Sequence, residues 1–267
     1  MQFTVRRAGG DNTRNSKLQV PRMTDLLLSK PRTILRLASL AAFLGLGCQT
    51  TPTHQDPFVI PRQQFLDSVN TVVVASVAVV GQLSVSDSTL ELVERLIEER
   101  MSDAGFSVVP ASEYVAIWDR IAGSAGGFFD PYTGERDEER FEAAASLLRD
   151  EIMERFKPDA LLYPEIWEVE VPFTHGDARW GGMSQLVEGA RVYSGNALAA
   201  SLFVVVQDTL GNELYVKEAG IQLLERMELG EMTPIPDEEV FSDTTWVKAA
   251  VQMALDQLVA KPEQVPR

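Results

Sequence analysis

The sequence predicts an α/β fold with a single mixed β-sheet and helices packed mainly on one face. Three observations support this class: a β-branched apolar run at residues 70–80, apolar residues at helical spacing in several later segments, and two apolar runs around a turn at residues 208–212. The predicted element order is β-α-β-(α)-α-β-β-β-α. A strand, a helix and a strand in succession favour a parallel crossover at the start of the domain.

The first predicted strand, residues 70–80, is a run of apolar and β-branched residues, which is typical of a strand buried on both faces. Ser88-Thr-Leu-Glu91 matches a capping box, and Gly105 suits the C-terminal cap of the helix expected between them. The inward positions of this helix are apolar: Leu90, Val93, Ile97 and Met101. A second, short strand is predicted over residues 106–110.

The middle of the chain predicts two further helices and a long strand. A short helix is expected after Ser112, with Tyr114, Trp118 and Ile121 facing inward, and the glycine-rich segment 123–127 is expected to break it. A longer amphipathic helix follows over residues 141–156 and is expected to stop at Lys157-Pro158. Residues 160–171 are predicted as a strand.

Residues 172–195 are rich in glycine and contain several aromatic residues, so we expect an irregular excursion or an extended hairpin there. Residues 197–207 and 213–224 predict two strands of a hairpin, joined by the turn Asp208-Thr-Leu-Gly-Asn212. Asp243 is the predicted cap of a last helix with one apolar face.

These patterns divide the chain into an N-terminal region and one globular domain. The predicted segments are an extension over residues 1–22, a signal peptide over residues 23–47, a lipidated N-terminus with a proline-rich tether over residues 48–67, a single α/β domain over residues 68–261, and a tail over residues 262–267. Met23 is an alternative start to Met1, because it begins a signal peptide of ordinary length.

The predicted signal peptide combines a basic region with a short apolar region. Lys30, Arg32 and Arg36 provide the positive charge, and Leu37–Gly47 is the apolar region. This run is much shorter than the roughly 20 apolar residues that span a bilayer, so it predicts a cleaved signal rather than a transmembrane helix.

The only cysteine of the chain, Cys48, follows this apolar run directly. Gly47-Cys48 resembles a bacterial lipobox, in which the signal peptide is cleaved before a cysteine that then carries acyl chains such as palmitate. A leucine usually stands three residues before that cysteine, where this sequence has Gly45. Gln49 after the cysteine implies sorting to the periplasmic face of the outer membrane of a Gram-negative cell. The alternative is an incidental free cysteine behind an ordinary secretion signal.

Charge excludes one class of partner. The chain has 24 Lys and Arg residues against 39 Asp and Glu residues, and residues 1–47 contain eight of the basic and two of the acidic ones. The remainder therefore carries a net charge near −21. Nucleic acids bind basic surfaces through their phosphates, so we expect no nucleic-acid partner.

The predicted domain resembles the small α/β domain of a group of bacterial envelope proteins. Its element order, the run Val72–Val80, the segment Gly105-Phe-Ser-Val-Val-Pro110 and the turn Asp208-Thr-Leu-Gly-Asn-Glu-Leu-Tyr215 are similar to those of the group. The group includes the curli-secretion lipoproteins, the activator lipoproteins of peptidoglycan synthases and the amino-terminal domain of the Tol-system propeller protein. This resemblance implies a role in envelope assembly or regulation, and it assigns no functional residue.

No cofactor or metal is predicted, and one catalytic arrangement stays open as an alternative. The chain has two histidines: His54 lies in the predicted tether, and His175 has Asp177 and Ser184 nearby in the sequence. A histidine, a carboxylate and a serine can form a hydrolytic site, although the strained Gly-x-Ser-x-Gly turn of many hydrolases is missing. A zinc site needs three or four ligands, which this composition does not offer.

Large apolar side chains gather in the two glycine-rich segments, and two interpretations are open. The residues are Phe128, Phe129, Tyr132, Trp180, Met183 and Tyr193. They either fold back as small cores or form a partner-binding surface, since aromatic anchors contribute much of the binding energy of interfaces.

Together these patterns predict a membrane-anchored, non-enzymatic lipoprotein that binds other envelope proteins as an accessory or scaffold. A lipid-anchored oligomeric subunit of an outer-membrane secretion assembly is the first alternative, with the 172–195 segment between neighbouring copies of a homo-oligomer. A hydrolase that uses His175 is the second.

Overall fold

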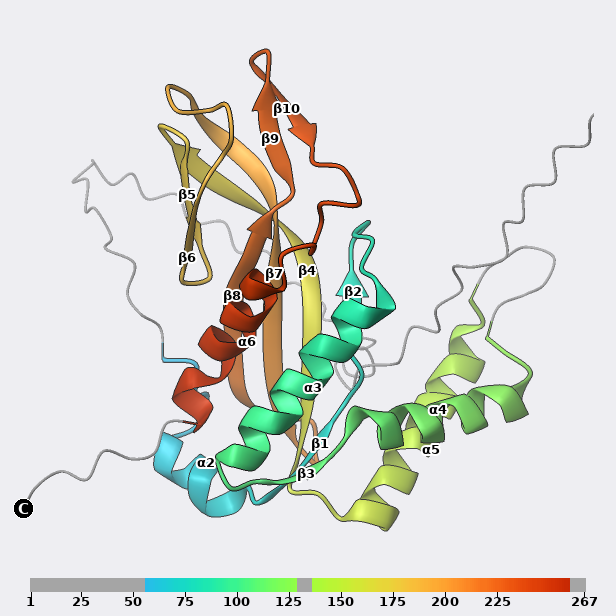
Figure 1. The fold of residues 1–267 in the computed structure, drawn as a ribbon. Coiled ribbons are helices and arrows are strands. Elements are labelled where there is room, and N and C mark those ends of the chain that lie inside the picture. Colours follow the sequence, from blue (N-terminus) through green and yellow to red (C-terminus); the bar gives the residue numbers. More distant parts are fainter. Residues whose placement is uncertain (1–55, 129–135, 260–267) are drawn as a thin grey trace, which may run out of the picture.

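A computed structural model describes residues 56–128 and 136–259 (Figure 1). The elements within these ranges are α2 (Arg62–Ser68), β1 (Thr71–Val74), β2 (Ala78–Val80), α3 (Asp87–Asp103), β3 (Ser107–Val109), α4 (Ala111–Ala125), α5 (Glu138–Phe156), β4 (Ala160–Thr174), β5 (Asp177–Trp180), β6 (Met183–Leu186), β7 (Ser194–Asp208), β8 (Glu213–Leu223), β9 (Glu225–Glu228), β10 (Glu231–Pro234) and α6 (Thr244–Val259).

The sheet is mixed, which confirms the predicted α/β class. Strand β4 pairs along its whole length with antiparallel β7, and β7 pairs with antiparallel β8. On its other side β4 meets β1 and β2 in parallel and then β5 in antiparallel orientation. Strand β3 adds to β1 in parallel, so β1, α3 and β3 form the predicted strand-helix-strand unit. Strands β9 and β10 form a separate two-stranded hairpin.

Helices cover the two faces of the sheet unequally. Helices α2, α3 and α6 bury their apolar faces against one face, where they build the largest hydrophobic cluster of the described residues. Helices α4 and α5 cover the other face near β1 and the start of β4. Figure 1 shows α3 and α6 lying across β4, β7 and β8, with α4 and α5 set to one side.

The run 70–80, predicted as one strand, is divided into β1 and β2. The Ala75 amide still donates to the carbonyl of Leu162 on β4, at 2.9 Å. The Val77 amide instead donates to Glu94 Oε1 of α3, at 3.0 Å. Burial raises the pKa of the Glu94 carboxyl, in spite of this hydrogen bond. The strand is interrupted because a helix side chain takes the amide of Val77.

Residues 56–67 were predicted as part of the tether, but the structure packs them against the domain. The amide of Val216 donates to the carbonyl of Pro57 at 2.9 Å, and the amide of Val59 donates to that of Leu214 at 3.0 Å. The ring of Phe58 lies 5.0 Å from that of Tyr215, centroid to centroid. Helix α2 follows and buries Phe65 in the main core. Apolar side chains of this segment pack against β8. The prolines of the segment predicted a tether, but they carry no information about this distant contact.

Two helix ends also differ from the prediction. The cap of α3 is Ser86, whose Oγ accepts from the Thr89 amide at 3.3 Å, rather than Ser88. Helix α4 runs through Gly123 and ends at Gly126, which has a φ of 73°. Asp243 caps α6 as expected, with its Oδ1 accepting from the Thr245 amide at 2.9 Å.

Candidate interaction site on the β-arm

The upper ends of β4, β7 and β8 extend beyond the helices and carry two hairpins, β5–β6 and β9–β10 (Figure 1). We call this part, residues 169–199 and 220–236, the β-arm. The segment 172–195 inside it is thus an extended hairpin, the second of the two predicted alternatives. It consists of the end of β4, the β5–β6 hairpin and the start of β7.

The β-arm has a small core of its own. Alternate residues of each strand point into it, as expected for β-structure in which successive side chains point to opposite faces. The buried residues are Val171, Phe173, Ala178, Trp180, Met183, Val187, Ala190, Ala197, Ala199 and Leu223. The side chains on β7 are alanines, which leave room for the large rings supplied by β4 and β5.

The sheet curls in the β-arm until the β5–β6 hairpin reaches β8. Gln185 on β6 provides the contact: its Nε2 donates to the Ile221 carbonyl at 3.3 Å, and its Oε1 accepts from the Leu223 amide at 2.9 Å. The amide of Gly220 donates to the carbonyl of Gly181 at 3.1 Å. A side-chain amide here takes the place of a paired strand, so the edge of β8 is covered.

Three of the large apolar residues that were predicted to form either small cores or a partner-binding surface are buried. Trp180 and Met183 lie in the β-arm core, and a Cβ on Gly220 would come within 2.8 Å of the Trp180 ring. Phe128 lies in a different cluster under α4 and α5, stacked on Trp118 with ring centroids 5.1 Å apart. The structure therefore does not bring these three residues to one surface.

Tyr193 is half exposed on the β-arm. The remaining residues of the predicted site, Phe129, Tyr132, Gly47 and Cys48, lie outside the described residues.

The geometry around His175 gives no support to the hydrolase alternative. The Ser184 hydroxyl donates directly to Asp177 Oδ1 at 2.8 Å, and Arg179 Nε donates to Asp177 Oδ2 at 2.7 Å. These bonds, from Ser184 first, lower the pKa of the Asp177 carboxyl. His175 lies in the turn before β5, where its backbone amide donates to Ser194 Oγ at 3.2 Å. A triad needs the serine to donate to the histidine, whereas this serine donates to the carboxylate.

Within the described ranges, no three histidine, cysteine or acidic side chains gather as a metal site would require. In the same part of the chain, no helix is both long enough and apolar enough to cross a membrane.

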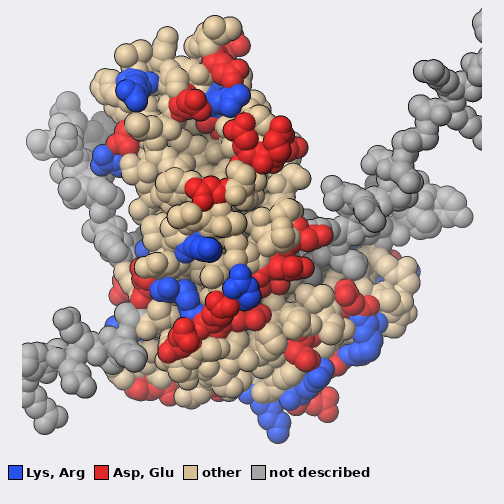
Figure 2. Space-filling view, viewed as in Figure 1, with Lys and Arg blue, Asp and Glu red and all other residues tan. Residues whose placement is uncertain are grey.

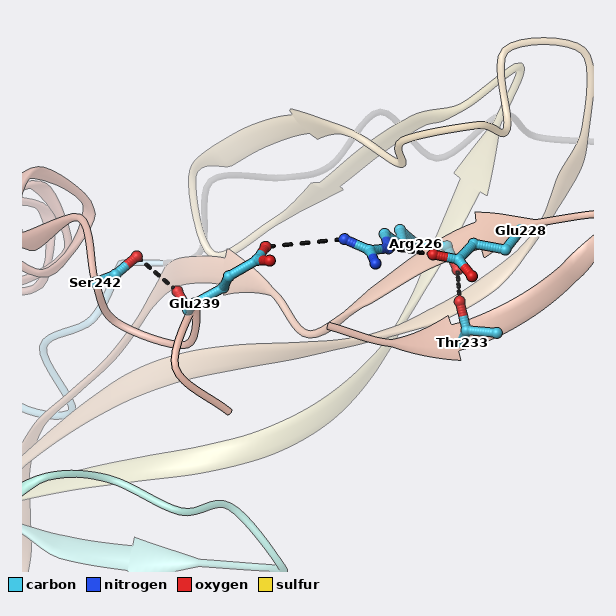
Figure 3. A network of polar contacts seen from close by, with 5 residues as sticks. All are labelled: Arg226, Glu228, Thr233, Glu239 and Ser242. Carbon is cyan, nitrogen blue, oxygen red and sulfur yellow. Dashed lines mark hydrogen bonds and ion pairs between the residues drawn. The ribbon is translucent and has the colours of Figure 1, made fainter. Parts of the chain in front are cut away.

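The β9–β10 hairpin was not predicted, because its residues are charged and lack alternating apolar positions. Its register pairs Met227 with Met232 and Glu228 with Glu231. Figure 3 shows the contacts that brace its base: Arg226 Nε contacts Glu228 Oε1 at 2.6 Å, and Thr233 Oγ1 donates to the Arg226 carbonyl at 3.2 Å. Arg226 Nη1 also lies 3.8 Å from Oε2 of Glu239, in the segment that leads to α6.

The far end of the β-arm exposes large apolar side chains. These are Leu186 (61% exposed), Val192 (79%), Tyr193 (47%) and Leu229 (107%). On the face shown in Figure 2, the upper part of the molecule combines uncharged surface with acidic side chains and a few basic ones. We call this end of the β-arm, with its exposed apolar side chains, the arm tip.

Comparisons with known proteins give limited information. No protein-family model matches the sequence, and no curated protein matches it. Among solved structures, lipoprotein GNA1162 from Neisseria meningitidis is 16% identical, with 71% of this chain and 97% of that chain covered and a TM-score of 0.33.

Two further structures are similar to a comparable degree. The structure of the PelC dodecamer from Paraburkholderia phytofirmans is 9% identical in sequence. The match covers 78% of this chain and 96% of the PelC chain, with a TM-score of 0.31. The hypothetical protein CT253 from Chlamydia trachomatis is 13% identical, with 71% and 96% covered and a TM-score of 0.29. Scores this low carry no argument about function, which must come from the chain itself.

Proposed function

We propose that this chain is a lipid-anchored envelope lipoprotein that acts without catalysis, as a protein-binding accessory or scaffold at the periplasmic face of the outer membrane. The observation that carries the proposal is the position of Cys48. It directly follows an apolar run of signal-peptide length, and no other cysteine occurs in the chain. Stable anchoring takes more than one acyl chain, as bacterial lipoproteins carry.

The start of the packed domain gives this anchor a defined reach. Asp56 is the eighth residue after Cys48, and Pro57 is already hydrogen-bonded to β8. Fully extended, such a connection spans about 26 Å at roughly 3.3 Å per residue. Acylation at Cys48 would therefore hold the domain close to the membrane surface.

The experiment is a comparison of the full chain with its Cys48→Ser variant in the native cell. We expect the wild type to incorporate a radiolabelled fatty acid and to sediment with membranes, and the variant to do neither. His54→Ala, in the predicted tether, is the matched control and is expected to behave like the wild type. A wild-type chain that takes up no label and stays in the soluble fraction contradicts the proposal.

A further inference from the structure

We propose that the β9–β10 turn is a docking finger, in which Leu229 enters an apolar pocket with a basic rim on a partner protein. The inference rests on the proposed function, in that it takes the chain to be a protein-binding accessory, and it names the contact surface and the chemistry of the partner. Its basis is a set of local features at the arm tip that do not serve the fold.

The first feature is the backbone conformation of the turn. Leu229 has a φ of 53° and Gly230 a φ of 91°, and they join the paired residues Glu228 and Glu231. A two-residue hairpin turn with positive φ at both positions favours Asn-Gly or Asp-Gly. Leucine is disfavoured at positive φ because its Cβ crowds the backbone. The chain thus places a poorly suited residue at the one position where asparagine is preferred.

The second feature is exposure. Leu229 is the most exposed of the large apolar side chains in the described residues, so it contributes nothing to any core. Its neighbours Glu228 and Glu231 lie directly opposite each other, and like charges in that position are destabilising. Strained and unfavourable groups that persist together are typical of functional sites.

The third feature is a rigid base beneath the turn. The Met227 amide donates to the Glu188 carbonyl at 2.8 Å. Gly189 lets the two backbones approach, since a Cβ there would lie 2.1 Å from the Met227 carbonyl oxygen. The Arg226 contacts with Glu228 and Glu239 brace the other side (Figure 3). A contact group held in place loses little conformational freedom on binding, which favours affinity.

Charge selects the kind of partner. In residues 186–193 and 227–232, which carry the arm tip, the exposed charged side chains are Glu188, Arg191, Glu228 and Glu231, three acidic against one basic. An acidic rim fits a basic rim on the partner. A second copy of this chain fits less well, because the whole chain has a formal net charge of −15.

The position of the anchor argues against the membrane as the surface that the finger meets. Residue 57 lies beside Val216, and Leu229 is the thirteenth residue after Val216, just beyond β8 and β9. That distance is about 40 Å along the strands at roughly 3.3 Å per residue, more than the roughly 26 Å that the connection from Cys48 can span. If the strands stood upright with the arm tip facing the bilayer, the connection could therefore not reach a lipid at Cys48.

The test uses the full chain in its native cell with a photoreactive amino acid in place of Leu229 or, as the control, Leu210. Leu210 is 79% exposed and lies in the β7–β8 turn, at the other end of β8. The protein crosslinked at residue 229 is identified by mass spectrometry and purified, and its affinity is measured for the wild type and for Leu229→Asn and Leu210→Asn.

We expect one protein to be captured from residue 229 and not from residue 210. Leu229→Asn should weaken its binding about tenfold or more, as for a central apolar anchor, and Leu210→Asn should change it less than twofold. The melting temperature of Leu229→Asn should stay the same or rise by about 2 °C, because asparagine suits the turn. Glu231→Lys, which leaves the Arg226–Glu228 contact in place, should slow association and reduce its salt dependence.

Four results overturn the inference: crosslinks to lipid, crosslinks to a second copy of the chain, no crosslink specific to residue 229, or unchanged affinity of Leu229→Asn. Membrane sedimentation of Leu229→Asn is measured in the same cells. The proposed lipid anchor fails if the wild type is soluble and unlabelled, and the finger fails if Leu229→Asn binds like the wild type. The two failures are therefore read from different measurements.

Discussion

The helix-covered body and the β-arm share the same three long strands but are stabilised differently. In the body, the strands lie between helices, and large side chains such as Ile97, Trp118 and Tyr215 fill the space between the layers. In the β-arm, helix cover is reduced to Met253 of α6, which packs against the small core, and the sheet curls until Gln185 on β6 bonds to β8. The same three strands are therefore packed between helices in one half and form a curled sheet with a small core in the other half.

The two regions also differ in the residues that permit close contact. The stability of the helix-covered body depends on large apolar side chains, which the helical spacing of apolar residues in the sequence predicts. The β-arm depends on glycines that admit a neighbour and on the amide of Gln185, which bonds to β8 twice. The body should therefore be most sensitive to substitutions that shorten a buried side chain. The β-arm should be most sensitive to substitutions that add atoms at its glycines.

Truncation in the body should have the largest effect. Trp118→Ala removes a buried ring that stacks on Phe128 and meets Phe141 edge-on, with the latter centroids 5.7 Å apart. We expect the free energy of unfolding to fall by about 3–5 kcal/mol, measured by urea denaturation. Trp118→Phe should cost much less, because it keeps a ring and removes an indole N–H that is buried without a hydrogen-bond partner among the described residues. Equal losses for the two variants would show that packing of the ring is not what matters there.

Addition in the β-arm should have a smaller and more local effect. A Cβ at Gly220 would lie 2.7 Å from Met183 Cβ and 2.8 Å from the Trp180 ring. We expect Gly220→Ala to lower the stability by about 1–3 kcal/mol and to speed hydrogen exchange in β5, β6 and β8 before the body.

Gly123 provides the matched control for this prediction. It lies in α4 with open space where a Cβ would stand, so Gly123→Ala should raise the stability by about 0.4–1 kcal/mol. If both alanines have the same effect, the proposed dependence of the β-arm on close approach is wrong.

The β7–β8 turn and the β9–β10 turn lie at opposite ends of the molecule and differ in how well their residues suit the turn. In the β7–β8 turn, Asp208 Oδ1 accepts from the amides of Leu210 and Asn212, and Oδ2 accepts from Asn212 Nδ2. Burial alone would raise the pKa of Asp208, but these hydrogen bonds outweigh it and lower the pKa below its ordinary value of 3.8. This turn suits its sequence, unlike the turn at Leu229.

Asp208 should therefore stabilise the protein above its unfolded pKa, and this contribution should be lost as the pH falls through the lower folded pKa. We expect Asp208→Asn to be less stable than the wild type near pH 6. The difference should shrink as the pH falls below 3.8 and through the lower folded pKa, because protonation of the wild type removes this contribution. Urea midpoints measured over this pH range test it, and a difference independent of pH would assign the effect to the side-chain geometry alone.

Local patterns predicted the body well. Val93, Ile97 and Met101 are fully buried on α3, and Gly105 follows that helix with a φ of 100°, as their spacing and position predicted. The hairpin around residues 208–212 is confirmed. These features depend on residues within one element, so the sequence displays them directly.

Long-range contacts account for what the sequence did not reveal. The division of β1 from β2 depends on Glu94, which lies 17 residues beyond its partner Val77. The burial of Trp180 depends on Gly220, which is distant along the chain. The arm tip could have been noticed from Leu229-Gly230, because leucine before glycine between charged residues is unusual for a turn. The lipidation of Cys48 stays a prediction, since residue 48 lies outside the described residues.

The short pairing of residues 57–59 with β8 also determines how the domain responds to force. The chain enters this pairing antiparallel to β8, so with the proposed anchor at Cys48 a pull along the strand from the N-terminus would load both hydrogen bonds together. The ring of Phe58, set against Tyr215 and Phe65, resists the same displacement. Tyr215 is in turn fixed to α6, since its hydroxyl donates to the Ala254 carbonyl at 2.6 Å. Tension on the N-terminus is therefore distributed into the largest core, and the hairpins at the far end remain mechanically unloaded.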